Sequence, residues 1–230
     1  MYNPCGMLHC LPRWLCFLAI CSVPAMAAPL CVTETLDNYV ALGAGGCQIG
    51  GVTVVNVSYT FVSGTISIPD TDITVTPSSG SDLIGLTFSS SDFSASGTNS
   101  AVYMLSYTWD PGDIRSLEDI LNDPPSFPGL AQITTVDCED AAFSPTCLTS
   151  TDTLVVSDNG VTMVLDDSVS FSPTVGTLGI QNTIELEGNR TGTGEFTSFE
   201  NQIGVPEPST IVPCLLLTVP MLRRWRLKRV

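Results

Sequence analysis

In the segment Val52–Ser63, side chains at odd-numbered positions differ in character from those at even-numbered positions. This alternation constrains the fold more than any other feature of the sequence. A period of two is the period of a β-strand that buries one face. The apolar set consists of Thr53, Val55, Val57, Tyr59 and Phe61, and the other set of Val52, Val54, Asn56, Ser58 and Thr60. The apolar set is nearly all β-branched or aromatic, so we predict that it faces the core of a half-buried strand.

Similar short apolar runs recur along the chain, separated by Ser, Thr, Gly, Asp and Pro. Further strands are predicted at Ile73–Thr76, Leu83–Ser89, Ala101–Trp109, Ala131–Val136, Thr153–Ser157, Val161–Leu165, Gly179–Glu187 and Phe196–Ile203. Asp158-Asn159-Gly160 lies between two of these runs and predicts a hairpin with a type I′ turn, because Asn-Gly readily adopts positive φ. Many short strands at this spacing predict an all-β chain with a single β-sandwich-like domain.

Helical signals are sparse, so few short helices are expected. Thr35–Leu42 predicts two helical turns. Asp113–Leu121 predicts another short helix, with Asp113 as its N-cap and with Arg115 and Asp119 paired one turn apart.

Residues 1–27 have the pattern of a secretory signal peptide. Arg13 ends a weakly charged leading region, Trp14–Cys21 forms a short apolar core, and Ala25–Ala27 offers the small-x-small pattern of a cleavage site. We expect cleavage after Ala27. The chain is therefore predicted to pass through the Sec translocon and to be exported.

Residues 205–230 combine a Pro-containing motif, an apolar stretch and a basic terminus. The motif consists of Val205, Pro206, Glu207 and Pro208. The apolar stretch is Ile211–Leu222, and the basic end consists of Arg223, Arg224, Arg226, Lys228 and Arg229. This tail resembles the PEP-CTERM sorting signal of exported proteins of Gram-negative bacteria. The resemblance implies that an exosortase, a membrane protease-transferase, recognises and processes the chain.

The apolar stretch of the tail suits a temporary anchor better than a permanent span. As a helix, Ile211–Leu222 would be about 18 Å long, against a hydrocarbon core of roughly 30 Å. Pro213 and Pro220 weaken that helix further. The basic end is expected to stay cytoplasmic, which leaves the preceding chain outside. We therefore expect a transient inner-membrane anchor, followed by release to the cell surface or the extracellular matrix.

The exported region between these ends, residues 28–204, is strongly acidic. It contains two basic residues, Arg115 and Arg190, against 22 acidic ones, which gives a formal charge of −20. Such a region repels nucleic acid and anionic lipid. It also contains neither lysine nor histidine, which excludes Ser-His-Asp, Cys-His, Schiff-base and His-ligated zinc chemistry.

The exported region contains four cysteines: Cys31, Cys47, Cys138 and Cys147. In an oxidising compartment they are expected to form two disulfides. Three connectivities are open, and proximity in the sequence favours 31–47 with 138–147. A zinc site built from all four thiolates would lack the usual close ligand spacing.

Acidic residues cluster at Asp70/Asp72, Asp110/Asp113, Asp137/Glu139/Asp140 and Asp166/Asp167. The simplest interpretation is a set of solvated loops. A structural calcium ion is the alternative, although no cluster matches a full EF-hand loop or a repeated calcium-binding nonapeptide. A glycoside hydrolase would need two carboxylates facing each other across a cleft, which the sequence cannot show. No other cofactor is expected, and metal-binding residues are left unassigned.

Trp109 shares one parity of its predicted strand with Tyr103 and Tyr107. Such a row can form the core face of a sandwich strand, or an exposed platform that stacks on sugar rings. The favoured function is a non-catalytic, exported surface or matrix protein. The resemblance of the tail implies association with exopolysaccharide or biofilm. A carbohydrate-binding module built around Trp109 and a carboxylate-dependent glycoside hydrolase are the alternatives.

Overall fold

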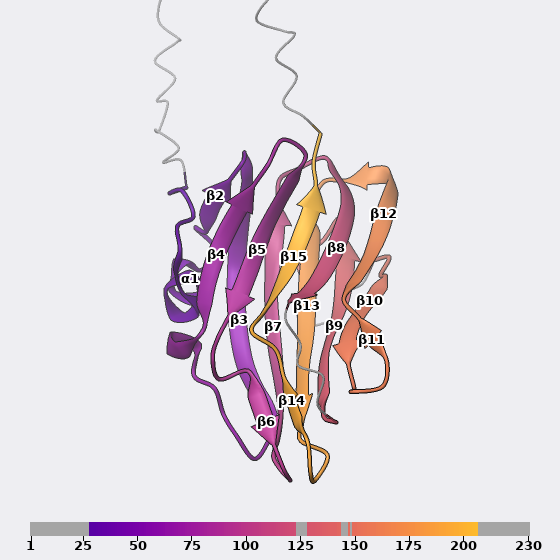
Figure 1. Ribbon diagram of the computed structural model, residues 1–230. Coiled ribbons are helices and arrows are strands. Elements are labelled where there is room, and N and C mark those ends of the chain that lie inside the picture. The colour runs from indigo at the N-terminus through magenta and orange to yellow at the C-terminus, as the bar shows by residue number, and fades with distance from the viewer. Residues whose placement is uncertain (1–27, 123–127, 144–146, 148, 207–230) are drawn as a thin grey trace, which may run out of the picture.

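Two antiparallel sheets pack face to face in the computed structural model, which describes residues 28–122, 128–143, 147 and 149–206 (Figure 1). The seven-stranded sheet has the order β11 (Met163–Val164), β10 (Thr153–Asp158), β9 (Leu130–Glu139), β13 (Leu178–Glu187), β7 (Ser100–Asp110), β3 (Val52–Gly64) and β2 (Cys47–Ile49). The six-stranded sheet has the order β1 (Glu34–Thr35), β4 (Thr74–Ser79), β5 (Leu83–Ser89), β15 (Ser198–Gly204), β8 (Ile114–Asn122) and β12 (Asp166–Val175). The predicted all-β sandwich is confirmed.

Two smaller features complete the described fold. Strands β6 (Ser94–Ser96) and β14 (Thr193–Glu195) form a two-stranded ribbon at one end of the sandwich. The helix α1 (Leu36–Leu42) packs beside β3 with Leu36 and Tyr39 buried, as the sequence predicted for this segment. A single 3-10 turn, η1, covers Asp70–Asp72.

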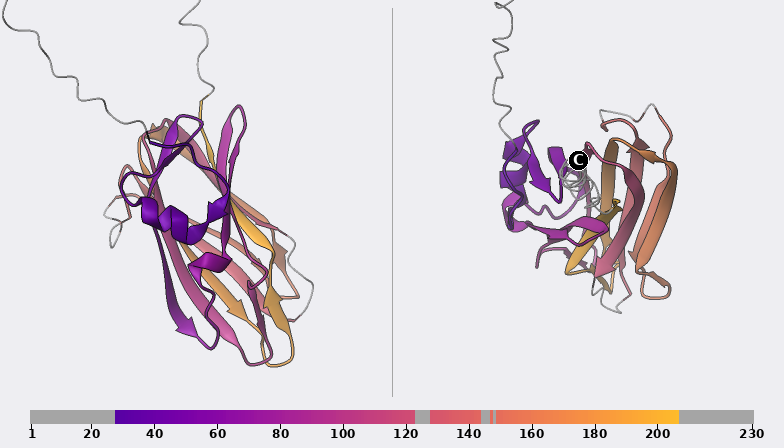
Figure 2. Two further views of the ribbon diagram at one scale, coloured as in Figure 1. Left: turned by 90° about the vertical axis from the view of Figure 1, so that its left-hand side faces the viewer. Right: turned by 90° about the horizontal axis from the view of Figure 1, so that it is seen from above.

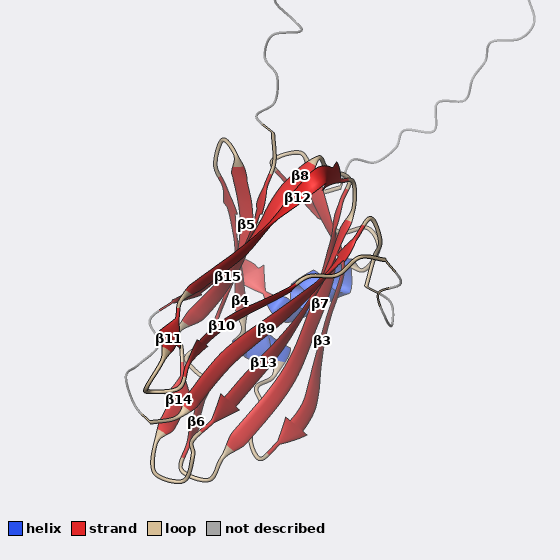
Figure 3. Ribbon diagram, turned by 90° about the vertical axis from the view of Figure 1, so that its right-hand side faces the viewer, coloured by secondary structure: helices blue, strands red, loops and turns tan. Residues whose placement is uncertain are grey.

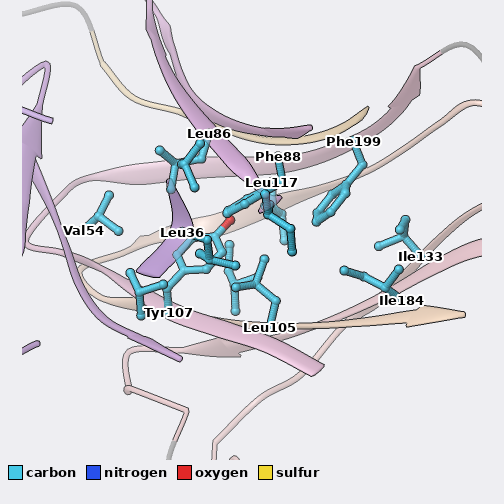
Figure 4. Close-up of a cluster of buried hydrophobic side chains, with 14 of the residues drawn as sticks. Leu36, Val54, Leu86, Phe88, Leu105, Tyr107, Leu117, Ile133, Ile184 and Phe199 are labelled. Atoms are coloured by element: carbon cyan, nitrogen blue, oxygen red, sulfur yellow. The ribbon is translucent and has the colours of Figure 1, made fainter. Parts of the chain in front are cut away.

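The core lies between the two sheets and is lined by alternate residues of each strand (Figure 4). Leu105 and Ile184 come from the seven-stranded sheet, whereas Phe88, Leu117 and Phe199 come from the six-stranded one. The buried cluster lies wholly within residues 28–206, and this part of the chain therefore has the core that a domain needs to fold by itself.

Strand β3 buries a different face at its start from the one predicted. Val52 and Val54 are buried there, whereas Val57 is buried further along, and Phe61 is 40% exposed. The pairing with β7 shifts by one residue at Asn56, which has φ of 55°. This β-bulge adds one residue to β3 and so reverses which side chains face the core. A single alternating pattern cannot represent such a strand.

The predicted helix over Asp113–Leu121 is wrong, because this segment forms strand β8. Arg115 is exposed and Asp119 is buried, so the expected pair between them does not form. Strand β8 hydrogen-bonds to β15 on one side and to β12 on the other. This pairing within the sheet outweighs the weak local preference for a helix.

The predicted hairpin at Asp158 is confirmed, but its turn differs from the predicted type. Strands β10 and β11 pair with Asp158 opposite Met163, so four residues form the loop rather than two. The Asn159 side-chain oxygen accepts hydrogen bonds from the backbone N–H groups of Val161 and Thr162. Such a side-chain-capped loop replaces the type I′ turn, and Val161 lies in it rather than in a strand.

Both predicted disulfides are present, Cys31–Cys47 and Cys138–Cys147. The first bond attaches the segment before α1 to β2, and the Cys31 N–H also donates to the Gln48 carbonyl at 3.0 Å. The second bond ties the end of β9 to the segment that leads into β10.

The two ends of the described chain leave the sandwich at the same end (Figures 1 and 3). The first described residues lie beside β2, where the Gln48 N–H donates to the Pro29 carbonyl, and residue 206 lies two residues after the end of β15. We call this the exit end; the β6–β14 ribbon lies at the opposite end (Figure 2). Residues 1–27, with the predicted signal peptide, and residues 207–230 lie outside the described chain. Within the described part, no helix has both the length and the apolar character needed to cross a membrane.

Candidate functional site

The turns at the exit end surround a hollow of about 680 Å³. It is lined by Gly50, Gly51, Val52, Ser79, Gly80, Ser81, Ile84, Pro111, Gly112, Asp113, Arg115, Val205 and Pro206. A second hollow of about 560 Å³ shares Arg115, Val205 and Pro206 with the first. Three turns of the sandwich therefore meet at the point where the chain leaves its last strand. Loop clusters at the end of a sandwich are a common place for binding sites.

The shape of the larger hollow depends on close packing around the β2–β3 turn. Gly50 and Gly51 have φ of 55° and 95°, which few other residues adopt. A Cβ atom on Gly50 would come within 2.7 Å of the Ile84 side chain. Across the hollow, the Gly112 N–H donates to the Gly176 carbonyl at 2.8 Å and fixes the β7–β8 turn.

The start of the predicted sorting motif is held at the rim of both hollows. Val205 follows β15, a central strand of the six-stranded sheet, and its N–H donates to the Asp82 carbonyl at 2.8 Å. Val205 and Pro206 are half-buried. The remaining predicted sorting residues lie outside the described chain: Glu207, Pro208, Arg223, Arg224, Arg226, Lys228 and Arg229.

Arg115 is the cation of the exit end. Its side chain is exposed, and no ion pair joins it to a carboxylate within the part of the chain that the structure describes. A guanidinium group in this setting can bind a carboxylate through two parallel hydrogen bonds. From the sequence, Arg115 is expected only to pair with Asp119, and that prediction is wrong.

The aromatic row of β7 faces the core. Tyr103, Tyr107 and Trp109 are each at most 1% exposed, which agrees with the core interpretation and leaves none of the three rings available for stacking on a sugar. The Tyr107 ring contacts Trp109 edge-on at 5.8 Å. Any carbohydrate site on this domain must therefore use other side chains.

A chain of buried polar side chains crosses the core and was not predicted. Thr135 donates to Asn182 at 2.6 Å, and Asn182 donates to Asn201 at 2.8 Å. Asn201 donates in turn to Asp119 at 2.6 Å and accepts from the Tyr107 hydroxyl at 2.7 Å. The chain links β9 and β13 of one sheet to β15 and β8 of the other.

Burial raises the pKa of the Asp119 carboxyl to about 6. The hydrogen bond from Asn201 opposes this rise, whereas the nearby charges of Asp167 and Asp137 add to it. Burial likewise raises the pKa of Asp137 to about 6. Neither carboxyl lines the exit-end hollows, and the two groups do not form the open carboxylate pair of a glycoside hydrolase.

The predicted acidic clusters are used mainly as hydrogen-bond acceptors within the fold. Asp137 accepts from the backbone N–H of Asp152, and Asp167 accepts from that of Val155 at 2.9 Å. Asp140 accepts from the Gly176 N–H at 2.7 Å, and Asp110 from the Thr177 hydroxyl at 2.8 Å. Among the residues that the structure describes, no three His, Cys, Asp or Glu side chains are placed to hold a metal ion together.

The outer face of the seven-stranded sheet carries two rows of uncharged side chains. One row consists of Thr60, Met104, Thr183, Thr134 and Val155, which lie opposite one another across β3, β7, β13, β9 and β10. The neighbouring row consists of Ser58, Ser106, Gln181, Val136 and Thr153. We call these ten residues the uncharged face. Glu185 borders these rows on the same face of β13, two residues from Thr183. The outer face of the other sheet carries two carboxylates at its centre, Glu118 and Glu200.

No protein-family description matches the sequence, and no curated protein matches it. Solved structures with a related layout include TmCBM61 in complex with β-1,4-galactotriose (12% identity, 73% of this chain and 97% of the other, TM-score 0.29). They also include the family 11 carbohydrate-binding module from Clostridium thermocellum in complex with a β-1,3-1,4-mixed-linked tetrasaccharide (12% identity, 77% of this chain and 99% of the other, TM-score 0.24). A third is the enzymatically active domain of tailspike protein 4 from bacteriophage CBA120 (12% identity, 70% of this chain and 21% of the other, TM-score 0.28). Similarity at this level assigns neither a family nor an activity.

Proposed function

We propose that this chain is a non-catalytic, exported protein of the cell surface or extracellular matrix, processed at the motif Val205–Pro208. The observation that carries the proposal is the position of residues 28 and 206 at one end of the sandwich. A segment anchored in the membrane after residue 206 would place the exit end toward the membrane and the β6–β14 ribbon away from it. The domain could then be released by one cut, without unfolding.

Mass spectrometry of the exported protein tests the proposal. In a host with the matching exosortase, the product should begin near Ala28, end close to the Pro-Glu-Pro motif and lack residues 215–230. Replacing Pro206, Glu207 and Pro208 by alanine should leave a membrane-associated form that ends at Val230. The neighbouring double variant Ser209→Ala, Thr210→Ala is the control and should be processed normally. A wild-type product that keeps Val230 in the native host would refute the sorting assignment.

A second candidate function is binding of a neutral polysaccharide, and the uncharged face favours it. The exported region has a formal charge of −20, yet five adjacent strands present hydroxyl, amide and aliphatic groups here without a charge. These strands span about 19 Å at the usual spacing between neighbours. An extended neutral glycan could lie across such rows, whereas an acidic glycan would be repelled by the rest of the domain.

Affinity electrophoresis in gels that contain a neutral β-glucan or β-galactan tests this candidate. Migration of residues 28–206 should be retarded, and Thr183→Glu, at the centre of the uncharged face, should abolish the retardation. Ser198→Glu is the matched control, because Ser198 lies on the outer face of β15 in the other sheet. Equal retardation of both variants would exclude the uncharged face as the binding surface.

A further inference from the structure

The loop between β10 and β11 exposes the dipeptide Asn159-Gly160 to solvent. Asn159 is the one asparagine of the sequence that is followed by a glycine. The backbone nitrogen of the residue after an asparagine can attack the side-chain amide carbon, because this attack closes a five-membered ring. A side chain on the attacking residue hinders the approach, and glycine has none. Asn159 is therefore the asparagine whose neighbour obstructs this reaction least.

The nucleophile in such an attack is the Gly160 nitrogen, and its N–H group faces a carboxylate. It donates to a side-chain oxygen of Asp158 at 2.8 Å. Asp158 is the last residue of β10, is only 6% exposed and pairs with Ala131 of β9, so the sheet fixes its position. A carboxylate at hydrogen-bond distance can accept the proton as a general base while the new bond to carbon forms.

The electrophile is the side-chain amide of Asn159, and two backbone N–H groups hold its oxygen. Val161 donates to this oxygen at 2.9 Å and Thr162 at 2.8 Å. Negative charge develops on the oxygen when the amide carbon is attacked, and donors that are already in place stabilise that charge. The amide nitrogen, which is the leaving group, donates to the Thr162 hydroxyl oxygen at 2.9 Å. The loop thus combines a base, a nucleophile and an oxyanion hole within five residues.

We propose that Asn159 is a site of spontaneous modification, where the folded loop accelerates the loss of the side-chain amide. The Gly160 nitrogen bonds to the Asn159 side-chain carbon, and Asp158 accepts the proton that this nitrogen loses. The proton then passes to the amino group, which departs as ammonia and leaves a cyclic imide. Water opens the imide at either carbonyl and gives aspartate or isoaspartate at position 159. One water is consumed and one ammonia is released, without oxidation or reduction.

The modification changes both the charge and the backbone of the hairpin. It adds a carboxylate beside Asp158 in a region whose formal charge is already −20. The isoaspartate product also places one more carbon in the backbone before Gly160, inside a loop that the hydrogen bond from the Asn159 N–H to the Thr162 carbonyl closes at 3.2 Å. Val161, which is 91% exposed, lies in the same loop. The change therefore alters one defined place at the edge of the seven-stranded sheet, next to β11.

Peptide mass spectrometry of residues 28–206, kept folded near neutral pH, tests the proposal. A synthetic peptide of residues 153–165 is the reference, because it has the same sequence without the fold. Conversion of Asn159 should be roughly tenfold faster in the folded protein than in the peptide. In water enriched in oxygen-18, each product should carry one heavy oxygen, and the aspartate and isoaspartate peptides should separate as isomers. Equal or slower conversion in the folded protein would overturn the proposal, since the hydrogen bonds would then only shape the loop.

A matched pair of variants tests the role of Asp158. Asp158→Asn keeps an oxygen that can accept from the Gly160 N–H but removes the base, so conversion should slow toward the rate of the peptide. Asp166→Asn, which alters an exposed carboxylate of β12, should convert at the wild-type rate. Asn189 is also exposed but is followed by Arg190, and it should stay unmodified in every sample. A wild-type rate in folded Asp158→Asn would overturn the assignment of Asp158 as the base.

Discussion

The Asn201 side chain donates a hydrogen bond to Asp119 at 2.6 Å in the middle of the sandwich core. Its carbonyl oxygen accepts from both Tyr107 and Asn182, so one amide joins the two sheets through two hydrogen bonds, while the bond to Asp119 lies within the six-stranded sheet. The second carboxyl oxygen of Asp119 has no partner within the described chain. A buried carboxyl with one unpaired oxygen is more stable without its charge.

Stability should therefore increase as the pH falls from 7 toward 4. The folded pKa of Asp119 is about 6 against an ordinary value of 3.8, so the folded state binds a proton that the unfolded state does not. The gain begins as the pH drops through 6 and is complete below about 4. The folded and unfolded pKa values of Asp119 differ by about two units, which corresponds to at most about 3 kcal/mol in the free energy of unfolding.

Urea denaturation at several pH values measures this gain. Asp119→Asn should remove the part of the pH dependence that comes from Asp119, and leave the part that comes from Asp137. Asp166→Asn, which alters an exposed carboxylate, should keep the wild-type profile. The assignment fails if Asp119→Asn and the wild type have parallel profiles between pH 4 and 7.

Removing the Asn201 amide should be costly. Asn201→Leu leaves the Asp119 carboxyl, the Tyr107 hydroxyl and the Asn182 amide without a shared partner in the core. Each buried group left unsatisfied costs about 1–3 kcal/mol, so a loss of roughly 3 kcal/mol is expected. Ser198→Ala, on the outer face of the same strand, should change stability by less than about 0.5 kcal/mol. Equal losses in the two variants would show that the polar chain contributes nothing specific.

The strands of the core were predictable because their signal is local. In residues 83–89 and 179–187 most apolar side chains alternate with polar ones, and both segments form strands that bury the apolar set, with Asn182 as a polar residue on the core face. Strand β12 escaped prediction because it is an edge strand whose first five residues, Asp166–Ser170, bury no side chain fully. Strand β8 is predicted as a helix because Asp113 suits an N-cap and Arg115 and Asp119 are spaced one helical turn apart. The buried partner of Asp119, Asn201, is distant in the sequence.

The candidate site was predictable only in part. The disulfide pairing and the absence of histidine and lysine from residues 28–204 can be read along the chain, and the sorting motif stays a prediction from the sequence. The exit-end hollow cannot, because it combines turns that are brought together only by the order of strands in the sheets. Arg115 could have been singled out as one of two cations in an acidic region, but nothing in the sequence places it beside Val205.

The bulge in β3 should tolerate glycine and reject β-branched residues. Asn56 has φ of 55°, a conformation that Asn and Gly adopt more easily than other residues. Asn56→Gly should change stability by less than about 0.5 kcal/mol, whereas Asn56→Val should cost about 1–2 kcal/mol. Thermal unfolding of the two variants provides the comparison, and equal losses would argue against a strained backbone at this position.

Calcium and magnesium should have equal effects on the melting temperature. The carboxylates of Asp137, Asp140 and Asp167 accept hydrogen bonds from backbone N–H groups instead of converging on one point. At equal ionic strength, either ion should only screen the repulsion within the acidic domain. A melting temperature that rises with calcium alone would reveal a site that binds only the folded state.

Breaking the Cys31–Cys47 disulfide should destabilise the domain and loosen its exit end. The bond joins residues 16 apart in the sequence, a separation for which the loss of a cross-link costs about 3 kcal/mol. It also holds the first described residues along β2, where the Gln48 N–H donates to the Pro29 carbonyl at 2.7 Å. Cys31→Ser with Cys47→Ser should therefore lower the free energy of unfolding by about that amount. Hydrogen exchange should accelerate at the Gln48 amide.

The bond between Cys138 and Cys147 provides the internal comparison. It spans 9 residues at the end of β9, which β13, β7 and β3 separate from β2, and its loss should destabilise the domain by a similar amount while exchange at Gln48 stays slow. In the oxidised protein of residues 28–206, a thiol reagent should label no cysteine before reduction, and four after it. Labelling of Cys31 or Cys47 before reduction would show that the exit end is not tied down in this way.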